Sequence, residues 1–186
     1  MICLIGLPGV GKSTVGRHLA RSLSCRFVDS DAEIEKRLGC TIREYFEREG
    51  EASFRDVEQA VIAELAGLGE GVLATGGGAV LRDANRQALR EASTVFYLRS
   101  KPEDLFRRLR HDTHRPLLQV RDPLRKLREL FMQRDPLYRR MAHFTIDTGR
   151  PSIPNLVNMI LMQLELAGLV DPALVPSPVE PRVLET

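Results

Sequence analysis

The chain has 186 residues, a length that favours one domain with a core large enough to be stable alone. Its 27 basic and 25 acidic residues leave a net charge of +2, which excludes a nucleic-acid-binding surface spread over the whole chain. No apolar run approaches the roughly 20 residues of a membrane-spanning helix. The three scattered cysteines indicate a reducing compartment. Because the first apolar run starts at residue 2 and leaves no room for a signal peptide, we expect a cytoplasmic protein without nucleic-acid or membrane partners.

Residues 2–5 form a short apolar run that is typical of a strand buried on both faces. The run leads into Gly6-Leu7-Pro8-Gly9-Val10-Gly11-Lys12-Ser13-Thr14, which fits the phosphate-binding pattern G-x-x-x-x-G-K-[ST]. Apolar residues then recur at helical spacing over 15–23. A glycine-rich turn that binds nothing is the alternative, but both flanks favour a nucleoside triphosphate site, with Lys12 near the β and γ phosphates and Ser13 placed for Mg²⁺. The expected nucleotide contacts from this loop are Gly9, Val10, Gly11, Lys12, Ser13 and Thr14.

Residues 26–29 predict a second short strand, which ends in Asp29-Ser30-Asp31. Two carboxylates two residues apart lie on the same side of the strand pleat. In an α/β sheet, the carboxyl end of a strand is where ligands bind, so we expect a functional role for this pair. Asp31 is also placed to cap the following helix, a structural role that is compatible with the functional one.

A capping box at Thr41-Ile42-Arg43-Glu44 predicts a helix that Gly50 interrupts, and a longer helix is expected over 54–68. Arg55 and Glu58 lie one turn apart on this longer helix. Their spacing alone favours a surface ion pair of little energetic weight.

A third strand, expected over 71–75, runs directly into Gly76-Gly77-Gly78. A compact turn rarely needs three glycines, so the triplet indicates close approach of the backbone to a ligand rather than a merely flexible turn. A helix over 81–91 and a fourth strand over 94–98 follow.

The next helix is expected to end near Arg110, and residues 111–121 show no helical periodicity. This polar, arginine-flanked segment contains Pro116, which stops a helix from continuing. In a phosphotransferase such a segment is expected to be a lid that closes over the nucleotide and excludes water. His111 and His114 have no third metal ligand nearby and are expected to be ordinary lid residues.

Asp122 and Pro123 are expected to begin a helix that carries Arg134. A fifth strand over 144–147 and a last helix capped by Ser152 complete a domain over 1–168, and the proline-rich residues 169–186 are expected to be a flexible tail. Five strands alternating with helices predict a parallel sheet covered on both faces, a doubly wound α/β fold. The phosphate loop, the carboxylate pair and the glycine triplet should then meet at one crevice.

The ordered set of motifs resembles the shikimate kinases over about residues 1–165. Besides the phosphate loop, the resemblance rests on Asp29-Ser30-Asp31, Phe54-Arg55, Thr75-Gly76-Gly77-Gly78, Arg115-Pro116-Leu117-Leu118 and Arg134-Asp135-Pro136-Leu137-Tyr138. It implies a P-loop NTPase fold of the nucleoside-monophosphate-kinase type with a lid. It also implies ATP-dependent phosphorylation of the 3-hydroxyl of shikimate, on the route to chorismate and the aromatic amino acids.

The resemblance implies a role for individual residues as well. Lys12, Asp31 and Arg115 would be catalytic, with Asp31 orienting the attacking hydroxyl and the two cations stabilising the transferring phosphoryl group. Ser13 and Asp29 would hold Mg²⁺ directly or through water. The shikimate ligands would be Asp31, Arg55, Gly76, Gly77, Gly78 and Arg134. Arg55 and Arg134 would hold the carboxylate, which replaces the surface-pair interpretation of Arg55. The adenine would be flanked by Arg110, Arg150 and Pro151, and Arg115 would also contact ATP.

Two other functions stay open at this point. A gluconate kinase of the same fold shares the loop and the lid, but the sugar chain of its substrate does not by itself require paired arginines at 55 and 134. A non-catalytic, shikimate-kinase-like binding module is expected to have lost Lys12, Asp31 or Arg115, and all three are present. We expect a monomer, because no long exposed apolar stripe in the sequence requires a partner.

Overall fold

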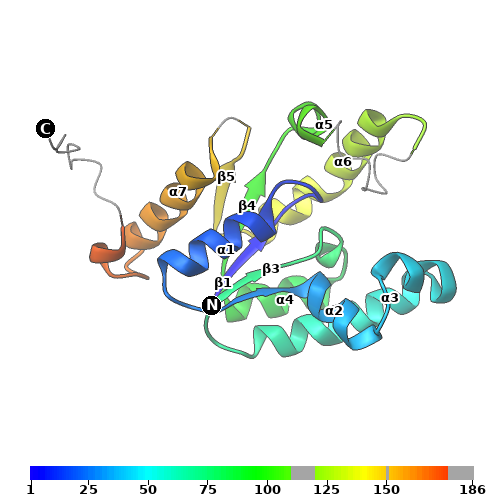
Figure 1. The fold of residues 1–186 in the computed structure, drawn as a ribbon, viewed down its shortest axis with the longest axis horizontal. Coiled ribbons are helices and arrows are strands. Elements are labelled where there is room, and N and C mark those ends of the chain that lie inside the picture. The colour runs from blue at the N-terminus through cyan, green and yellow to red at the C-terminus, as the bar shows by residue number, and fades with distance from the viewer. Residues whose placement is uncertain (110–119, 150, 176–186) are drawn as a thin grey trace, which may run out of the picture.

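The computed structural model of the chain describes residues 1–109, 120–149 and 151–175. Its centre is a sheet of five parallel strands in the order β2-β3-β1-β4-β5 (Figure 1). The strands are β1 (Ile2–Ile5), β2 (Phe27–Asp29), β3 (Val72–Ala74), β4 (Thr94–Arg99) and β5 (Phe144–Asp147). The five predicted strands are therefore confirmed, with ends that differ from the expected ones by at most one residue.

The central position of β1 follows from its side chains. Ile2 is in register with Val72 of β3 on one side and with Thr94 of β4 on the other. The next residues of β1, Cys3 to Ile5, are fully buried, as expected for a strand covered by helices on both faces. The strand order changes direction beside β1, and a doubly wound sheet forms its binding crevice at such a point.

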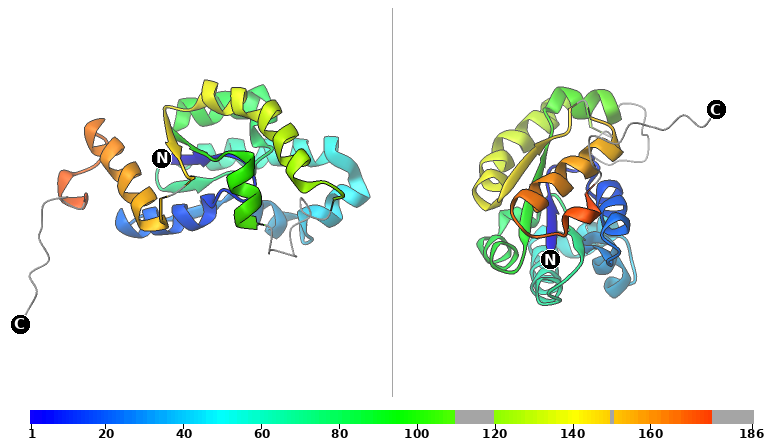
Figure 2. Two further views of the ribbon diagram at one scale, coloured as in Figure 1. Left: turned by 90° about the horizontal axis from the view of Figure 1, so that it is seen from above. Right: turned by 90° about the vertical axis from the view of Figure 1, so that its left-hand side faces the viewer.

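Helices cover both faces of this sheet, as the alternation of patterns predicted. α1 and α7 pack together on one face, and α4 and α6 lie on the other (Figure 2). The helices are α1 (Lys12–Ser22), α2 (Ser30–Leu38), α3 (Ile42–Ala66), α4 (Asp83–Ala92), α5 (Pro102–Leu109), α6 (Pro123–Met141) and α7 (Ile153–Leu166). The helix expected from residue 81 begins at Asp83, after the short 3₁₀ turn η1 (Ala79–Leu81).

Local signals explain the ends of several helices. The capping box is present, because Thr41 accepts a hydrogen bond from the backbone of Glu44 and the Glu44 side chain accepts one from the backbone of Thr41. The side chains of Asp122 and Ser152 cap α6 and α7 by accepting hydrogen bonds from the backbone N–H groups of Arg125 and Asn155. Gly50 has a φ of 82° and is not helical, so it kinks α3 and separates two helical segments at the break that the sequence predicted.

The segment after α7 is packed for several residues more than the sequence indicated. Val170 and Val175 contact the hydrophobic core, and the short 3₁₀ helix η3 (Pro172–Leu174) lies between them. Asp171 caps this turn by accepting a hydrogen bond from the backbone of Ala173. Residues 176–186 of the expected tail lie outside the described residues. Within the described part of the chain, no helix combines the length and the hydropathy needed to span a membrane.

Candidate active site

Three segments meet at the carboxyl edge of the sheet because the strands that precede them are parallel. The phosphate loop, residues 6–14, follows β1, the carboxylate pair lies at the end of β2, and the glycine triplet follows β3. Two adjoining cavities open there, and Pro8, Asp31 and Gly77 line both. The predicted convergence of the three motifs at one crevice is therefore present in the structure.

The phosphate loop curls around the smaller cavity, which has a volume of about 240 Å³. Its curl depends on Gly9 and Gly11, whose φ angles of 85° and 99° are left-handed and favour glycine. Gly11 lies at the N-terminus of α1, where unpaired backbone N–H groups and the helix dipole favour an anion. The Lys12 ammonium is buried at the loop and donates to the carbonyl oxygens of Gly6 and Leu7 at 2.9 and 3.1 Å.

Ser13 and Asp29 lie together at this cavity. The Ser13 hydroxyl donates to Asp29 Oδ2 at 2.5 Å, while Oδ1 of Asp29 accepts from the backbone N–H groups of Asp31 and Ala32. Asp29 is therefore the residue that caps α2, and the expectation that Asp31 has this role was wrong. Capping by Asp29 leaves the Asp31 carboxylate available to the crevice.

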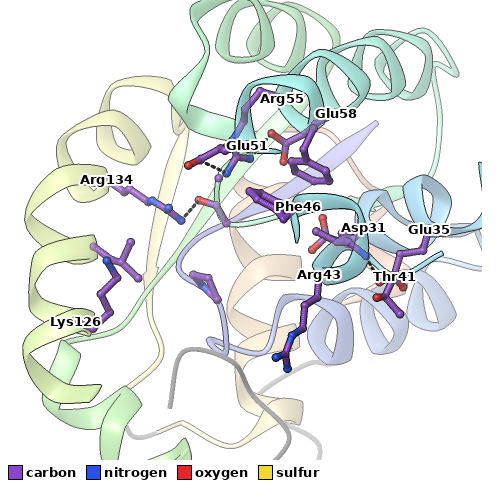
Figure 3. A pocket seen from close by; sticks show the side chains of 17 residues that line it. Asp31, Glu35, Thr41, Arg43, Phe46, Glu51, Arg55, Glu58, Lys126 and Arg134 are labelled. Atoms are coloured by element: carbon purple, nitrogen blue, oxygen red, sulfur yellow. Dashed lines mark hydrogen bonds and ion pairs between the residues drawn. The ribbon is translucent and has the colours of Figure 1, made fainter. Parts of the chain in front are cut away.

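The larger cavity, of about 670 Å³, lies between α3, α6 and the glycine triplet (Figure 3). Its walls combine the aromatic rings of Phe46 and Phe54 with the charged groups of Arg55 and Arg134. Arg55 enters from α3 and Arg134 from α6, so the two guanidinium groups reach the cavity from different walls (Figure 3). A small anion with an apolar body fits such a combination of walls.

Arg55 is not a surface residue, so the interpretation based on spacing was wrong. The Arg55 side chain is 13% exposed and that of Glu58 is 1% exposed, and Arg55 Nη1 lies 2.5 Å from Glu58 Oε2. The guanidinium also lies 5.8 and 5.2 Å from the ring centres of Phe46 and Phe54. Burial raises the pKa of Glu58, and the charge of Arg55 opposes this shift. The pair holds Arg55 at the cavity wall in a fixed orientation.

Arg134 has a buried donor that no described residue satisfies. Its Nη1 donates to the carbonyl oxygen of Gly77 at 2.9 Å. Its Nε is buried and has no hydrogen-bond partner among the described residues, where Arg134 also makes no ion pair. A guanidinium that has no carboxylate partner among the described residues and lies at a cavity wall favours a carboxylate ligand, which can accept two parallel N–H bonds.

Asp31 lies where the two cavities join. Burial and then the neighbouring charge of Asp29 raise the pKa of Asp31 to about 6, and the charge of Lys12 opposes this rise. A carboxyl group with such a pKa ionises just below neutral pH, so it can accept a proton under physiological conditions.

The glycine triplet provides space for the side chains of the site. A Cβ atom on Gly76 would overlap the carboxylate of Asp31, and one on Gly78 would overlap the guanidinium of Arg55. A Cβ on Gly77 would lie 2.6 Å from Cδ of Pro8 in the phosphate loop. None of the three glycines has a left-handed φ, so bulk and not backbone conformation explains their presence. The groups that approach these glycines are the protein's own side chains, and the close approach of the triplet to a ligand stays a prediction.

Comparison with known proteins identifies the family. The family model for shikimate kinase matches residues 8–165. A shikimate kinase of Paracidovorax citrulli is 59% identical over 175 residues, which cover 92% of this chain and 96% of the relative. The chain belongs to the shikimate kinase family. A solved shikimate kinase of Acinetobacter baumannii in complex with shikimate is 46% identical and has a TM-score of 0.83, with 91% of this chain and 94% of that chain covered. A gluconokinase of Sinorhizobium meliloti, 20% identical with a TM-score of 0.55 over 89% of this chain and 91% of that one, is similar in fold alone.

Three contributors to this shikimate kinase site were missed in the sequence. Glu58 was taken for a surface partner, and nothing in its spacing indicated burial. Arg108 lies in a basic run, yet its guanidinium donates to Val10 O at 3.4 Å and to Thr148 O at 2.6 Å, which ties the phosphate loop to the turn after β5. Tyr138 belongs to a motif that was noted, but its hydrogen bond to the Gly77 carbonyl at 2.6 Å could not be read from spacing.

The structure describes only some of the other residues predicted for the shikimate kinase site. Arg110, Arg115 and Arg150, His111 and His114, and most of the expected lid lie outside the described residues. Pro151 is described. It lines a separate cavity of about 700 Å³ beside α5 and does not line the smaller cavity at the phosphate loop. Its predicted place beside the adenine stays a prediction.

Proposed function

We propose that this chain transfers the γ-phosphoryl group of ATP to the 3-hydroxyl of shikimate and releases shikimate 3-phosphate and ADP. The observation that carries the proposal is the arrangement of the two cavities. A phosphate loop surrounds one, Arg134, which has no carboxylate partner among the described residues, lines the other, and a carboxyl group with a raised pKa lies where they join. Membership of the shikimate kinase family supports the same reaction.

The larger cavity suits the acid substrate. Arg55 and Arg134 would hold the carboxylate of shikimate, since arginine forks match the two oxygens of a planar carboxylate. The rings of Phe46 and Phe54 would contact the carbon ring, and the backbone of Gly76, Gly77 and Gly78 would approach its hydroxyls. Gluconate also carries a carboxylate, so the arginines alone do not separate the two substrates. The walls of aromatic rings favour a cyclic substrate over an open chain.

In the proposed reaction, the oxygen of the 3-hydroxyl forms a bond to the γ-phosphorus while the bond between the γ-phosphorus and the β–γ bridging oxygen breaks. The proton of the hydroxyl passes to the ionised carboxylate of Asp31. Lys12 neutralises the charge that spreads over the phosphoryl oxygens, and Arg115 is expected to contribute a second positive charge. Positioning and charge therefore provide most of the catalysis.

The donor set at the smaller cavity fits Mg²⁺. Ser13 and Asp29 offer a hydroxyl and a carboxylate oxygen, which are the hard ligands that Mg²⁺ prefers. The described residues contain no group of three or more His, Cys, Asp or Glu side chains able to hold a metal, so phosphate oxygens and water would complete the coordination. The buried Thr75 hydroxyl at this cavity has no hydrogen-bond partner among the described residues, which also favours a polar ligand there. Bound Mg²⁺ would neutralise the β and γ phosphates.

The proposal also includes the compartment and the oligomeric state of the enzyme. Cys3, Cys25 and Cys40 are unpaired, which supports a reducing compartment such as the cytoplasm. We expect the enzyme to be a monomer, because no long exposed apolar stripe in the sequence requires a partner. Light scattering of the purified protein measures this directly.

Coupled release of ADP tests the function. With Mg-ATP, we expect turnover to depend on shikimate and to remain at the background level with gluconate, the matched acid with an open chain. Asp31→Asn should lower the shikimate-dependent rate by at least about 100-fold, since it removes the proton acceptor. Equal rates with gluconate and shikimate would contradict the substrate assignment. ATP binding without acid-dependent turnover would favour the binding-module alternative.

A further inference from the structure

A second buried carboxylate, Asp135, lies next to the proposed substrate arginine but faces away from the cavity. Asp135 is 9% exposed, and its Oδ1 accepts hydrogen bonds from the Tyr97 hydroxyl at 2.9 Å and from Arg99 Nε at 3.1 Å. Oδ2 accepts from Arg139 Nε at 2.7 Å. Tyr97 and Arg99 belong to β4, so this carboxylate joins the middle of α6 to the sheet.

Arg134 and Asp135 are neighbours on α6 and therefore project in directions about 100° apart around the helix axis. Arg134 points to the glycine triplet, where it donates to Gly77, and Asp135 points to β4. An anchor on Asp135 consequently fixes the rotation of α6 about its axis, and this rotation determines where the Arg134 guanidinium lies.

The helix needs such an anchor at this point. Pro136 lies inside α6 and has no N–H group, so the carbonyl of Met132 lacks its usual helical hydrogen bond. A turn without this bond is easier to bend or rotate. Side-chain contacts from Asp135 and Tyr138 to the sheet and the triplet replace the lost restraint.

We propose that Asp135 is a positioning residue that orients Arg134 for the carboxylate of the acid substrate. The inference rests on the proposed function, because it concerns the same substrate. Asp135 does not touch the cavity, since it is not among the residues that line it. Its effect passes through α6 to Arg134.

ATP binding at the phosphate loop should not depend on Asp135. The turn after β5 is held by the backbone of Arg99, whose carbonyl accepts from the backbone N–H and the hydroxyl of Thr148 at 2.8 and 3.1 Å. Thr148 in turn accepts from Arg108, which also contacts the phosphate loop. These bonds do not use the Arg99 side chain, so the loss of Asp135 should leave ATP binding intact.

Four variants distinguish a loss of Arg134 orientation from a general loss of folded structure. Asp135→Leu removes every acceptor, whereas Asp135→Asn keeps an amide oxygen for Tyr97 and Arg99. Tyr97→Phe removes a single donor and preserves the ring, which keeps the test possible if Asp135→Leu does not fold. Arg139→Met is the matched control, because the Arg139 side chain is 57% exposed and does not reach β4.

The readouts are the KM values for shikimate and ATP, kcat, and direct binding of shikimate by calorimetry. We expect Asp135→Leu to raise the KM and the Kd for shikimate about tenfold, with the KM for ATP and kcat changed less than about threefold. Tyr97→Phe should give a smaller change of the same kind, whereas Asp135→Asn and Arg139→Met should resemble the wild type. Unchanged shikimate affinity in Asp135→Leu, or in Tyr97→Phe where the former does not fold, would overturn the inference, and so would equal losses for both substrates. A wild-type chain that binds no shikimate would overturn the proposed function itself.

Discussion

At the level of single residues, the proposed chemistry depends on the environment of Asp31. The carboxylate lies between the smaller cavity, which the phosphate loop surrounds, and the larger cavity, which would hold the acid substrate. A hydroxyl of this substrate would meet the γ-phosphate there. Burial and the nearby charge of Asp29 make its ionised form less stable than in water, whereas Lys12 favours that form. The balance gives a group that is ionised at neutral pH and still basic enough to take a proton.

The activity should therefore depend on pH in a defined direction. Since the pKa of Asp31 is about 6, we expect kcat/KM for shikimate to be constant above pH 7 and to fall about tenfold per unit below pH 6 as the carboxylate becomes protonated. An ordinary carboxylate with a pKa near 4 would move the fall about two units lower. Initial rates between pH 5 and pH 8 at constant ionic strength measure this profile. Constant kcat/KM down to pH 5 would contradict a proton acceptor with a pKa of about 6.

Arg55 and Glu58 show what sequence spacing cannot reveal about single residues. Two opposite charges three residues apart on a helix are usually exposed, and the sequence contains nothing that distinguishes this pair. The difference arises because α3 turns this face toward the glycine triplet, so the pair is buried beside Gly78. Resemblance to a family assigned Arg55 to the substrate, while Glu58 was missed. Burial of this kind depends on contacts between elements that are distant in the sequence.

At the level of elements, the glycine triplet connects the parts of the site. Its glycines lie against Asp31 from the start of α2, Pro8 from the phosphate loop and Arg55 from α3. The carbonyl of Gly77 also accepts hydrogen bonds from Arg134 and Tyr138 of α6. A small change of shape in the triplet should thus disturb substrate binding before it disturbs the fold.

Gly78→Ala tests this view of the triplet. The added methyl group would displace the Arg55 guanidinium, so we expect the KM for shikimate to rise about tenfold while the KM for ATP stays within about twofold. Steady-state kinetics with both substrates measure the two values. Gly67→Ala at the end of α3 is the matched control, because its Cβ would come no closer than 3.3 Å to the neighbouring carbonyl oxygen. A normal KM for shikimate in Gly78→Ala would contradict the proposed position of Arg55 at the substrate.

The elements themselves were largely predictable. Apolar runs and caps determine where β1, α6 and α7 begin, and these signals are local. The break expected at Gly50 is present as a kink, where the non-helical angles of the glycine separate two helical segments of α3. The anchoring of α6 on β4 through Asp135 was not foreseen, because a polar residue inside a helix gives no indication of the strand that it contacts.

At the level of the whole molecule, parallel strand order explains why the site forms. Each strand of the sheet delivers its following loop to the same edge, so motifs separated by up to dozens of residues become neighbours. This convergence could be predicted from the alternation of strands and helices. The division into two cavities that share Asp31, Pro8 and Gly77 could not, because it depends on how α3 and α6 pack above that edge.

Identification of the product tests the central claim most directly. The protein would be incubated with Mg-ATP and shikimate, and the product examined by phosphorus-31 NMR with correlation to the ring protons. We expect one new phosphomonoester signal that correlates with the proton on carbon 3, in an amount equal to the ADP formed. Release of inorganic phosphate without a phosphorylated acid, or a phosphate on another hydroxyl, would contradict the account of the two joined cavities and of Asp31 between them.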